Sequence, residues 1–448
     1  MPAARVSVPL VAFLGYVAVS MLMVNTPSRP LLPPPLGGKV QLGDFLFPLA
    51  VAPWLIAGLP GLRRVAAPAG VPVAIWVAAS AVTAAVAVSP GPAWRETAAL
   101  AYLGLVMVWG AAVLAEPAHL RFFVRWWVVI VAAVVTVGLA GWLVAMLSGR
   151  PNLLVDWKQG IPMLGDRIRI RSTLAPTSRL LMTLLIVALP AVFVLRRQGP
   201  LGARRWCGWL LLAMTACAVL TLARGLLEFL LLLGLLALLP WQGRRRALAA
   251  VLVGVYVVAF AGVVALSTWR VTAHDLAWGA DRSRSLGDRI YYATMPDLGV
   301  QTLDIHLEWV HDHYLILKRM AWRAFLERPL TGWGPDGWPA IRARAHELGI
   351  APPQVRFASA HSEIFGVAAE MGVIGLVAFT AFWVLVLRAM RSGAAGGFAG
   401  TLAHHQALAT VGVLLTALHL DVMRFRFLWI TLALGIAAAV CARQEATT

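Results

Sequence analysis

The sequence predicts an all-α polytopic membrane protein with about twelve transmembrane helices and a large loop on one side of the membrane. Hydrophobic residues make up 60% of the 448 residues and charged residues only 13%, whereas a soluble domain carries about 25% charged residues. Apolar runs long enough to cross a bilayer recur along the whole chain, and the mean hydropathy is +0.78. A soluble core of this length could not bury so many apolar side chains, so lipid is the expected solvent.

The apolar runs define the predicted spans, each close to the roughly 20 residues that cross the hydrocarbon region. The first run resembles the core of a signal peptide, but it is long for one and no small-x-small cleavage site follows it, so we interpret it as a retained span. The predicted spans are 6–24, 42–60, 71–89, 97–115, 124–147, 176–196, 208–222, 225–240, 246–267, 361–387, 402–420 and 425–442.

The orientation follows from the distribution of arginine among the short connections. One set of connections is rich in arginine and has almost no acidic residues. Short loops with an excess of Lys and Arg face the cytoplasm, so both termini are expected in the cytoplasm. The arginines of this set are Arg5, Arg63, Arg64, Arg121, Arg125, Arg196, Arg197, Arg204, Arg205, Arg244, Arg245, Arg246, Arg388, Arg391 and Arg443.

The two long loops, 148–175 and 268–360, fall on the opposite, non-cytoplasmic side. They divide the chain into the first five spans (1–147), a loop with spans six to nine (148–267), a large loop (268–360) and the last three spans with a short tail (361–448). Apolar residues at helical spacing predict an amphipathic helix over about 302–327. A second short helix is expected over about 338–348, and together the two helices would form a folded cap on the membrane.

The net charge of +18 indicates anionic partners. In so apolar a chain, anionic membrane lipids or an anionic lipid-linked substrate are more plausible than nucleic acid. No Asp-x-Asp pair and no phosphate-binding glycine loop occur, so we expect no metal, no cofactor and a donor that is not a nucleotide. The cysteines Cys207, Cys217 and Cys441 have no CxxC spacing, and His306, His311, Asp312 and His313 do not follow a metal-ligand pattern.

Arginines on the non-cytoplasmic side are the first candidates for a functional site. Arg319 and Arg323 lie one turn apart, with Trp322 between them, so two guanidinium groups could bind one anion. A solvated surface facing lipid phosphates is the alternative. Arg224 interrupts the apolar run at 208–240, where the simplest structure is a tight reversal with Arg224 at its tip. Charge at membrane depth is costly and usually functional, but pairing with Glu228 would explain it equally well.

Further candidates flank two other spans. Arg171 and Arg179 lie on either side of the start of the sixth span, where arginines can also serve only to fix a span in the interface. His361 opens the span after the cap, followed by Glu363, and a neutral imidazole can act as a general base near neutral pH. A lone histidine at an interface is more often a polar end group.

Three stretches together resemble the bacterial O-antigen ligases, a family related to the O-antigen polymerases and the bacterial O-oligosaccharyltransferases. Leu220-Thr-Leu-Ala-Arg-Gly225 is similar to the Thr-x-Ser-Arg-Gly of the family, with Ala223 in place of Ser. Arg319-Met-Ala-Trp-Arg and Pro329-Leu-Thr-Gly-Trp-Gly334 resemble its Arg-x-x-Trp helix and Gly-x-Gly turn. Ala360-His-Ser-Glu363 and Glu370-Met-Gly-Val-Ile-Gly-Leu376 resemble its last motif, with Ser362 where Asn is common.

The resemblance implies a glycosyltransferase-C-like fold and a metal-independent transferase of lipopolysaccharide biosynthesis in the bacterial inner membrane. The donor would be undecaprenyl-pyrophosphate-linked O-antigen, the acceptor would be lipid A–core oligosaccharide, and transfer would occur by inverting displacement on the periplasmic face. His361, Arg319 and Arg224 would be catalytic, and Arg171, Arg179, Arg323, Trp322 and Glu363 would bind substrate.

Three other functions remain open, one of which is a protein O-oligosaccharyltransferase. An O-antigen polymerase would use the same donor with a lipid-linked acceptor. A flippase or transporter for lipid-linked oligosaccharide belongs to a different class, although such proteins often have two similar halves, which this sequence does not show.

Overall fold

The computed structural model describes residues 7–22, 42–150, 152–161, 165–174, 178–221, 223, 225–239, 243–278, 316–351, 359–392 and 396–447. Most of these residues are helical. The N-terminal part contains α1 (Val8–Leu22), α2 (Leu42–Ile56), α3 (Leu62–Val65), the π-helix η1 (Ala66–Gly70), α4 (Val71–Ala85), α5 (Pro90–Leu114) and α6 (Pro117–Ser148). The remainder contains α7 (Ser178–Gln198), α8 (Leu201–Leu220), α9 (Leu226–Leu238), α10 (Arg244–Trp278), α13 (Trp338–Glu347), α14 (Glu363–Arg391), α15 (Gly397–Ala417) and α16 (Arg426–Thr447).

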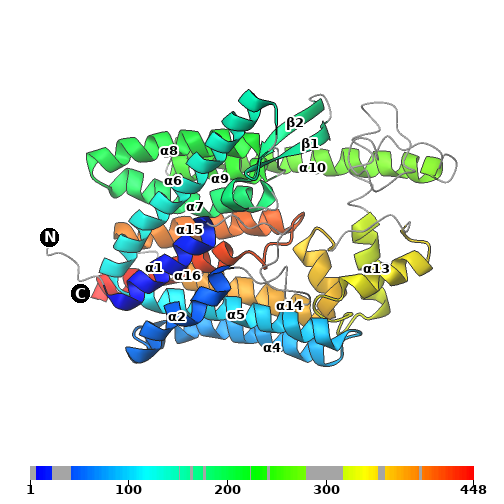
Figure 1. The fold of residues 1–448 in the computed structure, drawn as a ribbon, viewed down its shortest axis with the longest axis horizontal. Helices are drawn as coiled ribbons and strands as arrows, with labels where there is room; N and C mark the ends of the chain where they lie inside the picture. The colour runs from blue at the N-terminus through cyan, green and yellow to red at the C-terminus, as the bar shows by residue number, and fades with distance from the viewer. Residues whose placement is uncertain are drawn as a thin grey trace.

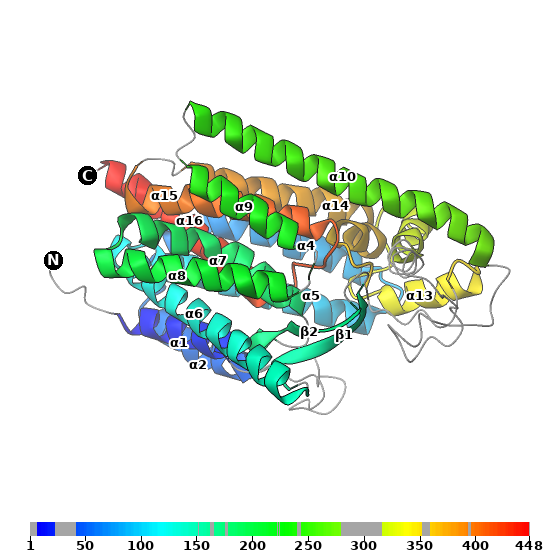
Figure 2. The same cartoon turned by 90° about the horizontal axis from the view of Figure 1, so that it is seen from above.

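The long helices run side by side and form a bundle with two different ends (Figure 1). At one end α1 begins and α16 finishes, and the arginine-rich connections meet there: Arg121 contacts Glu445 at 3.1 Å, and Arg443 donates to Ser392. At the other end lie α13 and the hairpin that follows α6, as the view from above also shows (Figure 2). The predicted arginine-rich side and the predicted cap are therefore at opposite ends.

Each predicted span coincides with a helix, although several boundaries differ. α5 begins at Pro90 and α6 at Pro117, about two turns earlier than the apolar runs indicated, because proline fits the first turn of a helix. Among the described residues, seven helical segments are long and apolar enough to cross a membrane, and three shorter apolar helices accompany them. The chain is thus a helical polytopic membrane protein, and the number of twelve spans stays a prediction.

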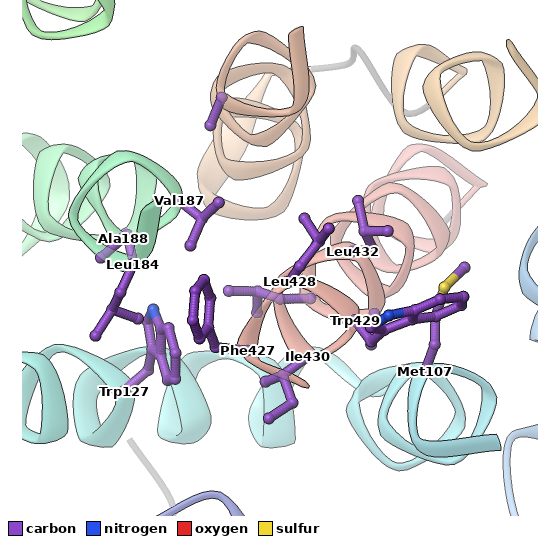
Figure 3. Packing of buried hydrophobic residues seen from close by; sticks show 14 of the residues in the cluster. Met107, Trp127, Leu184, Val187, Ala188, Phe427, Leu428, Trp429, Ile430 and Leu432 are labelled. Carbon is purple, nitrogen blue, oxygen red and sulfur yellow. The ribbon is translucent and has the colours of Figure 1, made fainter. Parts of the chain in front are cut away.

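α7 and α16 form the centre of the bundle, because 89% of the most apolar stretch of each helix is buried. Close packing of large side chains holds them against α5 and α6: Phe427 and Trp127 lie beside Leu184, while Trp429 lies near Met107 (Figure 3). Small residues on α16 such as Gly435 and Ala433 let neighbouring helices approach closely, as is usual where helices meet inside a membrane. This core places the start of α16 and the loop before it at the hairpin end.

The loop at 148–175 contains a β-hairpin that the all-α prediction did not include. β1 (Val155–Ile161) and β2 (Gly165–Ile170) pair antiparallel, with Val155 opposite Ile170. Ile168 and Ile170 are buried, which agrees with the period of two that a half-buried strand requires. The hairpin packs on the end of α6.

Two helices lie within the described part of the predicted cap. Residues 316–327 are helical, and α13 matches the predicted second helix. Leu317, Met320 and Ala324 pack against Trp338 and Ile341 in a small core of their own. The part of the predicted amphipathic helix at 302–315, with His306, His311, Asp312 and His313, lies outside the described residues.

Candidate functional site

The helix α14 is broken at Gly372, and a loop of the cap fills the break. Gly372 has φ 62° and ψ −154°, a region open essentially to glycine alone. The amides of Val373 and Ile374 donate to the carbonyls of Pro329 (2.8 Å) and Leu330 (3.2 Å). In return, the amides of Trp333 and Gly334 donate to the carbonyls of Ala369 (3.0 Å) and Glu370 (2.7 Å). The backbone groups that the break releases are thereby satisfied.

Glycine is required on both sides of this contact. A Cβ on Gly332 would lie 2.4 Å from the carbonyl carbon of Glu370, and a Cβ on Gly372 would lie 2.5 Å from that of Leu330. The 329–334 loop also reaches the α4–α5 connection, where the amide of Val88 donates to the carbonyl of Trp333 at 3.1 Å. The loop therefore joins three parts of the fold and fixes the position of Glu370.

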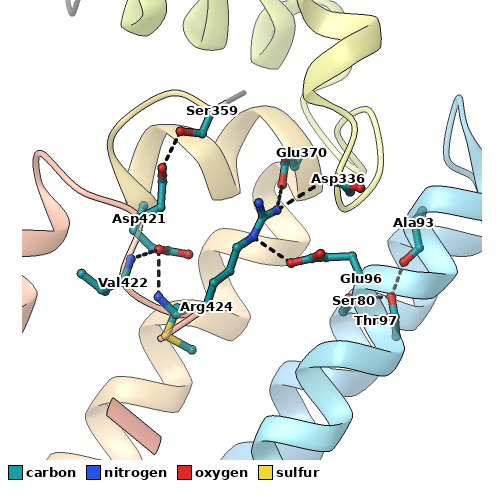
Figure 4. A network of polar contacts seen from close by, with 12 residues as sticks. Ser80, Ala93, Glu96, Thr97, Asp336, Ser359, Glu370, Asp421, Val422 and Arg424 are labelled. Atoms are coloured by element: carbon teal, nitrogen blue, oxygen red, sulfur yellow. Dashed lines mark hydrogen bonds and ion pairs between the residues drawn. The ribbon is translucent and has the colours of Figure 1, made fainter. Parts of the chain in front are cut away.

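Glu370 belongs to a group of carboxylates around Arg424, which lies in the α15–α16 loop (Figure 4). Nε of Arg424 lies 2.8 Å from Oε1 of Glu96, and Nη2 lies 3.9 Å from both Asp336 and Glu370. Burial lowers the pKa of Arg424. The nearby carboxylates, of which Glu96 has the largest effect, raise it by more, so the pKa lies above its ordinary value. Arg424 is therefore charged at any physiological pH.

A cavity of about 50 Å³ opens beside this group. Its polar lining comes from Glu96, Ser359, Glu363, Glu370, Asp421 and Arg424. The side chain of Arg424 remains 42% exposed although carboxylates surround it, because it borders this space. Glu96 and Glu370 lie within helices of spanning length, where ionisable side chains are costly and usually functional.

His361 follows Ser359 and Ala360, which line this cavity, and it has a strained backbone conformation with φ 47°. Such a φ is uncommon for residues other than glycine and is often found at functional sites. Its Nδ1 is 3.3 Å from Oγ of Ser359 and 3.9 Å from Oδ2 of Asp421. Ser359 in turn donates to Asp421 at 2.5 Å.

Arg179 approaches the same imidazole from the start of α7, with Nη1 3.4 Å from Nδ1 of His361. A guanidinium can only donate, so this contact favours a lone pair on Nδ1, whereas Ser359 and Asp421 favour a proton there. The hydroxyl hydrogen of Ser359 is used on Asp421, which leaves its oxygen as an acceptor. His361 thus lies between a cationic neighbour and an acidic one.

The comparison with protein families bears on this arrangement. Residues 209–380 match the family model for O-antigen ligase. This segment belongs to the O-antigen ligase family. The match runs from α8 into α14 and includes the turn at 221–225, the cap, His361, Gly332 of the 329–334 loop and Gly372 of the broken helix. No curated protein matches the chain.

Some candidate residues lie outside the segment assigned to the O-antigen ligase family, yet contact it. Arg179 comes from α7, and Glu96 from α5. Asp421 and Arg424 lie in the α15–α16 loop. The site is therefore assembled by the whole bundle around a family segment that supplies His361 and Glu370.

Glu363, predicted to bind substrate, holds the α15–α16 loop in place. Its Oε2 accepts hydrogen bonds from the amides of Val422 (2.6 Å) and Met423 (3.1 Å). It also lines the cavity, so its carboxylate can serve both purposes. Arg171 follows β2, and its Nη2 donates to the carbonyl of Val155 at 2.7 Å.

The remaining arginines that were predicted to act on substrate belong to the cap helix and to the turn at 221–225. Arg319, Trp322 and Arg323 are exposed on the helix at 316–327, and Arg323 pairs with Glu327 at 3.3 Å. The reversal between α8 and α9 is present as predicted, but Arg224 lies outside the described residues. Its expected partner Glu228 is buried, and its Oε1 lies 3.1 Å from Nε2 of His419 and 3.2 Å from the hydroxyl of Tyr256.

Sequence reasoning did not single out Arg424, Asp421, Glu96 or Ser359. A signal for two of them exists, because Asp421, Arg424 and Arg426 crowd a short connection between two apolar runs. Arg426 pairs with Asp44 and lies over the rings of Tyr16 and Tyr102, so it serves to fix α16 to the first two helices. Nothing in the sequence indicates that Glu96, far away in the chain, meets Arg424.

Proposed function

We propose that this protein is an O-antigen ligase that transfers O-antigen polysaccharide from undecaprenyl pyrophosphate to lipid A–core oligosaccharide. The proposal rests on the family of residues 209–380 and, above all, on the position of His361. One neighbour of the imidazole is the guanidinium of Arg179, which suits an anionic donor. The other neighbours are Ser359 and Asp421, which suit a hydroxyl-bearing acceptor.

The reaction is a direct displacement. His361 takes the proton of the acceptor hydroxyl, the oxygen forms a bond to the anomeric carbon, and the bond from that carbon to the pyrophosphate breaks. The electron pair leaves with undecaprenyl pyrophosphate, and the anomeric configuration inverts. General-base assistance of this kind contributes roughly 10²- to 10⁴-fold.

Binding of the donor would also prepare the base. A pyrophosphate attracts guanidinium groups more strongly than a neutral imidazole does, so it draws Arg179 away from Nδ1 of His361. The imidazole proton can then shift from Nε2 to Nδ1, where Ser359 and Asp421 accept it, and Nε2 is left with a lone pair. His361 would therefore become a general base when the donor is in place.

The arginines supply charge stabilisation for the leaving group without a metal ion. Arg179 is the one that the structure places beside His361, and Arg171 follows the hairpin at the same end of the bundle. The proposed donor site also includes Arg319, Arg323 and Trp322 on the cap and Arg224 in the turn at 221–225. Bidentate guanidinium groups bind pyrophosphate oxygens well, and donors fixed before reaction stabilise charge as it develops.

The proposed location is the bacterial inner membrane with the cap in the periplasm. The arginine-rich end of the bundle would face the cytoplasm, and anionic membrane lipids would surround it. In this orientation both termini are cytoplasmic, and the site opens where lipopolysaccharide is assembled.

Reconstitution tests the proposal. Purified protein in liposomes would receive lipid-linked O-antigen, with or without lipid A–core, in the presence of a chelator. We expect polymer on lipid A–core. Lengthening of the donor in the absence of lipid A–core would instead identify a polymerase. Movement of the donor across the bilayer without any transfer would identify a transporter and overturn the enzyme proposal.

A further inference from the structure

The cavity beside Arg424 has a chemistry that differs from that of a phosphate site. Carboxylates of Glu96, Glu363, Glu370 and Asp421 line it. Among the described residues, the one guanidinium that lines it is that of Arg424, which is already engaged by Glu96 at 2.8 Å. Like charges close together in a poorly solvated space repel strongly. A pyrophosphate would meet this repulsion, so the cavity does not suit the head group of the donor.

Sugar hydroxyls fit the same walls. A hydroxyl can donate to a carboxylate and accept from a guanidinium or another hydroxyl, and both kinds of group border this space. Hydrogen bonds to charged groups are also stronger than neutral ones. The hydroxyl of Ser359 adds a neutral group at the rim that leads to His361.

Trp76 adds a buried indole to the wall of the cavity. Its side chain is 2% exposed and lines the cavity. Its indole N–H has no hydrogen-bond partner among the residues that the structure describes. A buried indole N–H usually finds an acceptor, and a ring or hydroxyl oxygen of a carbohydrate is a suitable one.

The position of the cavity relates it to the proposed base. Asp421 and Ser359 line the cavity, and both also lie close to Nδ1 of His361. A hydroxyl group that enters here therefore comes beside the groups that orient the imidazole. Arg179 approaches His361 from α7 and does not line the cavity.

From these observations we infer that the cavity beside Arg424 is a subsite for the hydroxyl-bearing edge of the acceptor sugar, separate from the arginines that hold the donor. The inference rests on the proposed ligase function and adds the place of the acceptor to it. A cavity of about 50 Å³ holds roughly three to five water-sized groups. That space admits ring hydroxyls or a hydroxymethyl group and leaves the rest of the oligosaccharide outside.

Gly366 offers a way to fill the cavity without disturbing its charges. It lines the cavity on α14, and a Cβ there would meet only Oδ1 of Asp421, at an ordinary distance of 3.8 Å. Gly366→Ala should therefore fold, and Gly366→Val would fill more of the space. Gly254→Ala on α10 is the matched control, because a Cβ at Gly254 meets none of the described residues within 4 Å.

The experiment measures binding of lipid-free core oligosaccharide to the purified full-length protein without donor. We expect wild type and Gly254→Ala to bind equally, and Gly366→Ala to bind about tenfold more weakly, as the loss of one good hydrogen bond predicts. Gly366→Val should bind more weakly still. In the transfer reaction the Gly366 variants should raise the KM for lipid A–core and leave that for the donor unchanged.

Failure of this inference differs from failure of the proposed function. Unchanged acceptor binding in both Gly366 variants, or a change confined to the KM for the donor, would overturn the subsite even if ligation proceeds. Absence of transfer by wild type, with oligosaccharide binding still weakened in the Gly366 variants, would overturn the ligase and retain the subsite.

Discussion

The amide of Val373 donates to the carbonyl of Pro329 at 2.8 Å, and this bond joins the cap to the interior of a membrane-spanning helix. It exists because α14 opens at Gly372 and the 329–334 loop enters the gap. The motif resemblance around Pro329 and Gly372 thereby acquires a physical reason: the two stretches make one backbone junction that positions Glu370 and the start of α14.

Replacing a glycine at this junction should destabilise the protein. Gly372→Ala meets both a disfavoured backbone region and the carbonyl of Leu330. Gly349→Ala, where φ is 67° and a Cβ meets nothing within 4 Å, is the control for φ alone. We expect about 1–2 kcal/mol for Gly349→Ala and roughly 1–3 kcal/mol more for Gly372→Ala. Thermal unfolding in detergent measures both, and equal losses would contradict the close contact.

Arg424 and Glu96 should depend on each other. Arg424→Gln leaves Glu96 and Glu370 without their cation. Because the arginine is partly exposed, we expect a moderate loss of about 1–3 kcal/mol in the free energy of unfolding. Glu96→Gln in the same chain should recover part of this loss, as a double-mutant cycle would reveal. Strictly additive effects would mean that the ion pair contributes nothing.

Asp421 and Ser359 should act through the orientation of His361. Asp421→Asn removes the charge that favours a proton on Nδ1, and we expect kcat to fall about tenfold or more, as for the loss of one hydrogen bond to a charged group. The KM for the donor should change little. Glu347→Gln, which removes an exposed carboxylate of the cap, is the control. An unchanged kcat in Asp421→Asn would show that Asp421 has no part in orienting the base.

Arg179 should matter for the donor. Arg179→Ala removes a guanidinium from beside His361, and the KM for the donor should rise roughly 10- to 100-fold if a charge-assisted hydrogen bond to phosphate is lost. Arg179→Lys should restore only part of the affinity, because an ammonium lacks the planar fork. A larger effect on the KM for lipid A–core than on the KM for the donor would mean that Arg179 binds the acceptor and not the donor.

Much of the helical architecture could be predicted because lipid imposes a simple rule. An apolar run of spanning length must be helical, and each such run coincides with a helix. The hairpin was not predicted, although Arg167-Ile-Arg-Ile-Arg171 alternates strictly. The start of α5 at Pro90 was missed because its first turns are polar.

Only those residues of the site that stand at a recognisable place in the sequence could be predicted. His361 and Arg179 were singled out by their positions at the starts of spans, and the structure brings them together. Glu96, Glu370 and Arg424 come from three different helices or loops, and their meeting depends on how α5, α14 and α16 pack. No pattern within one segment carries that information. The roles of Arg319, Arg323, Trp322 and Arg224 stay predictions.

His361 provides the most direct test of the central claim. The measurement is kcat for transfer of O-antigen from the lipid-linked donor to lipid A–core in liposomes with a chelator, comparing wild type with His361→Gln. We predict transfer by wild type and a kcat lower by roughly 10²- to 10⁴-fold in the variant, with the KM for the donor nearly unchanged. Transfer by His361→Gln at the rate of wild type would contradict the account.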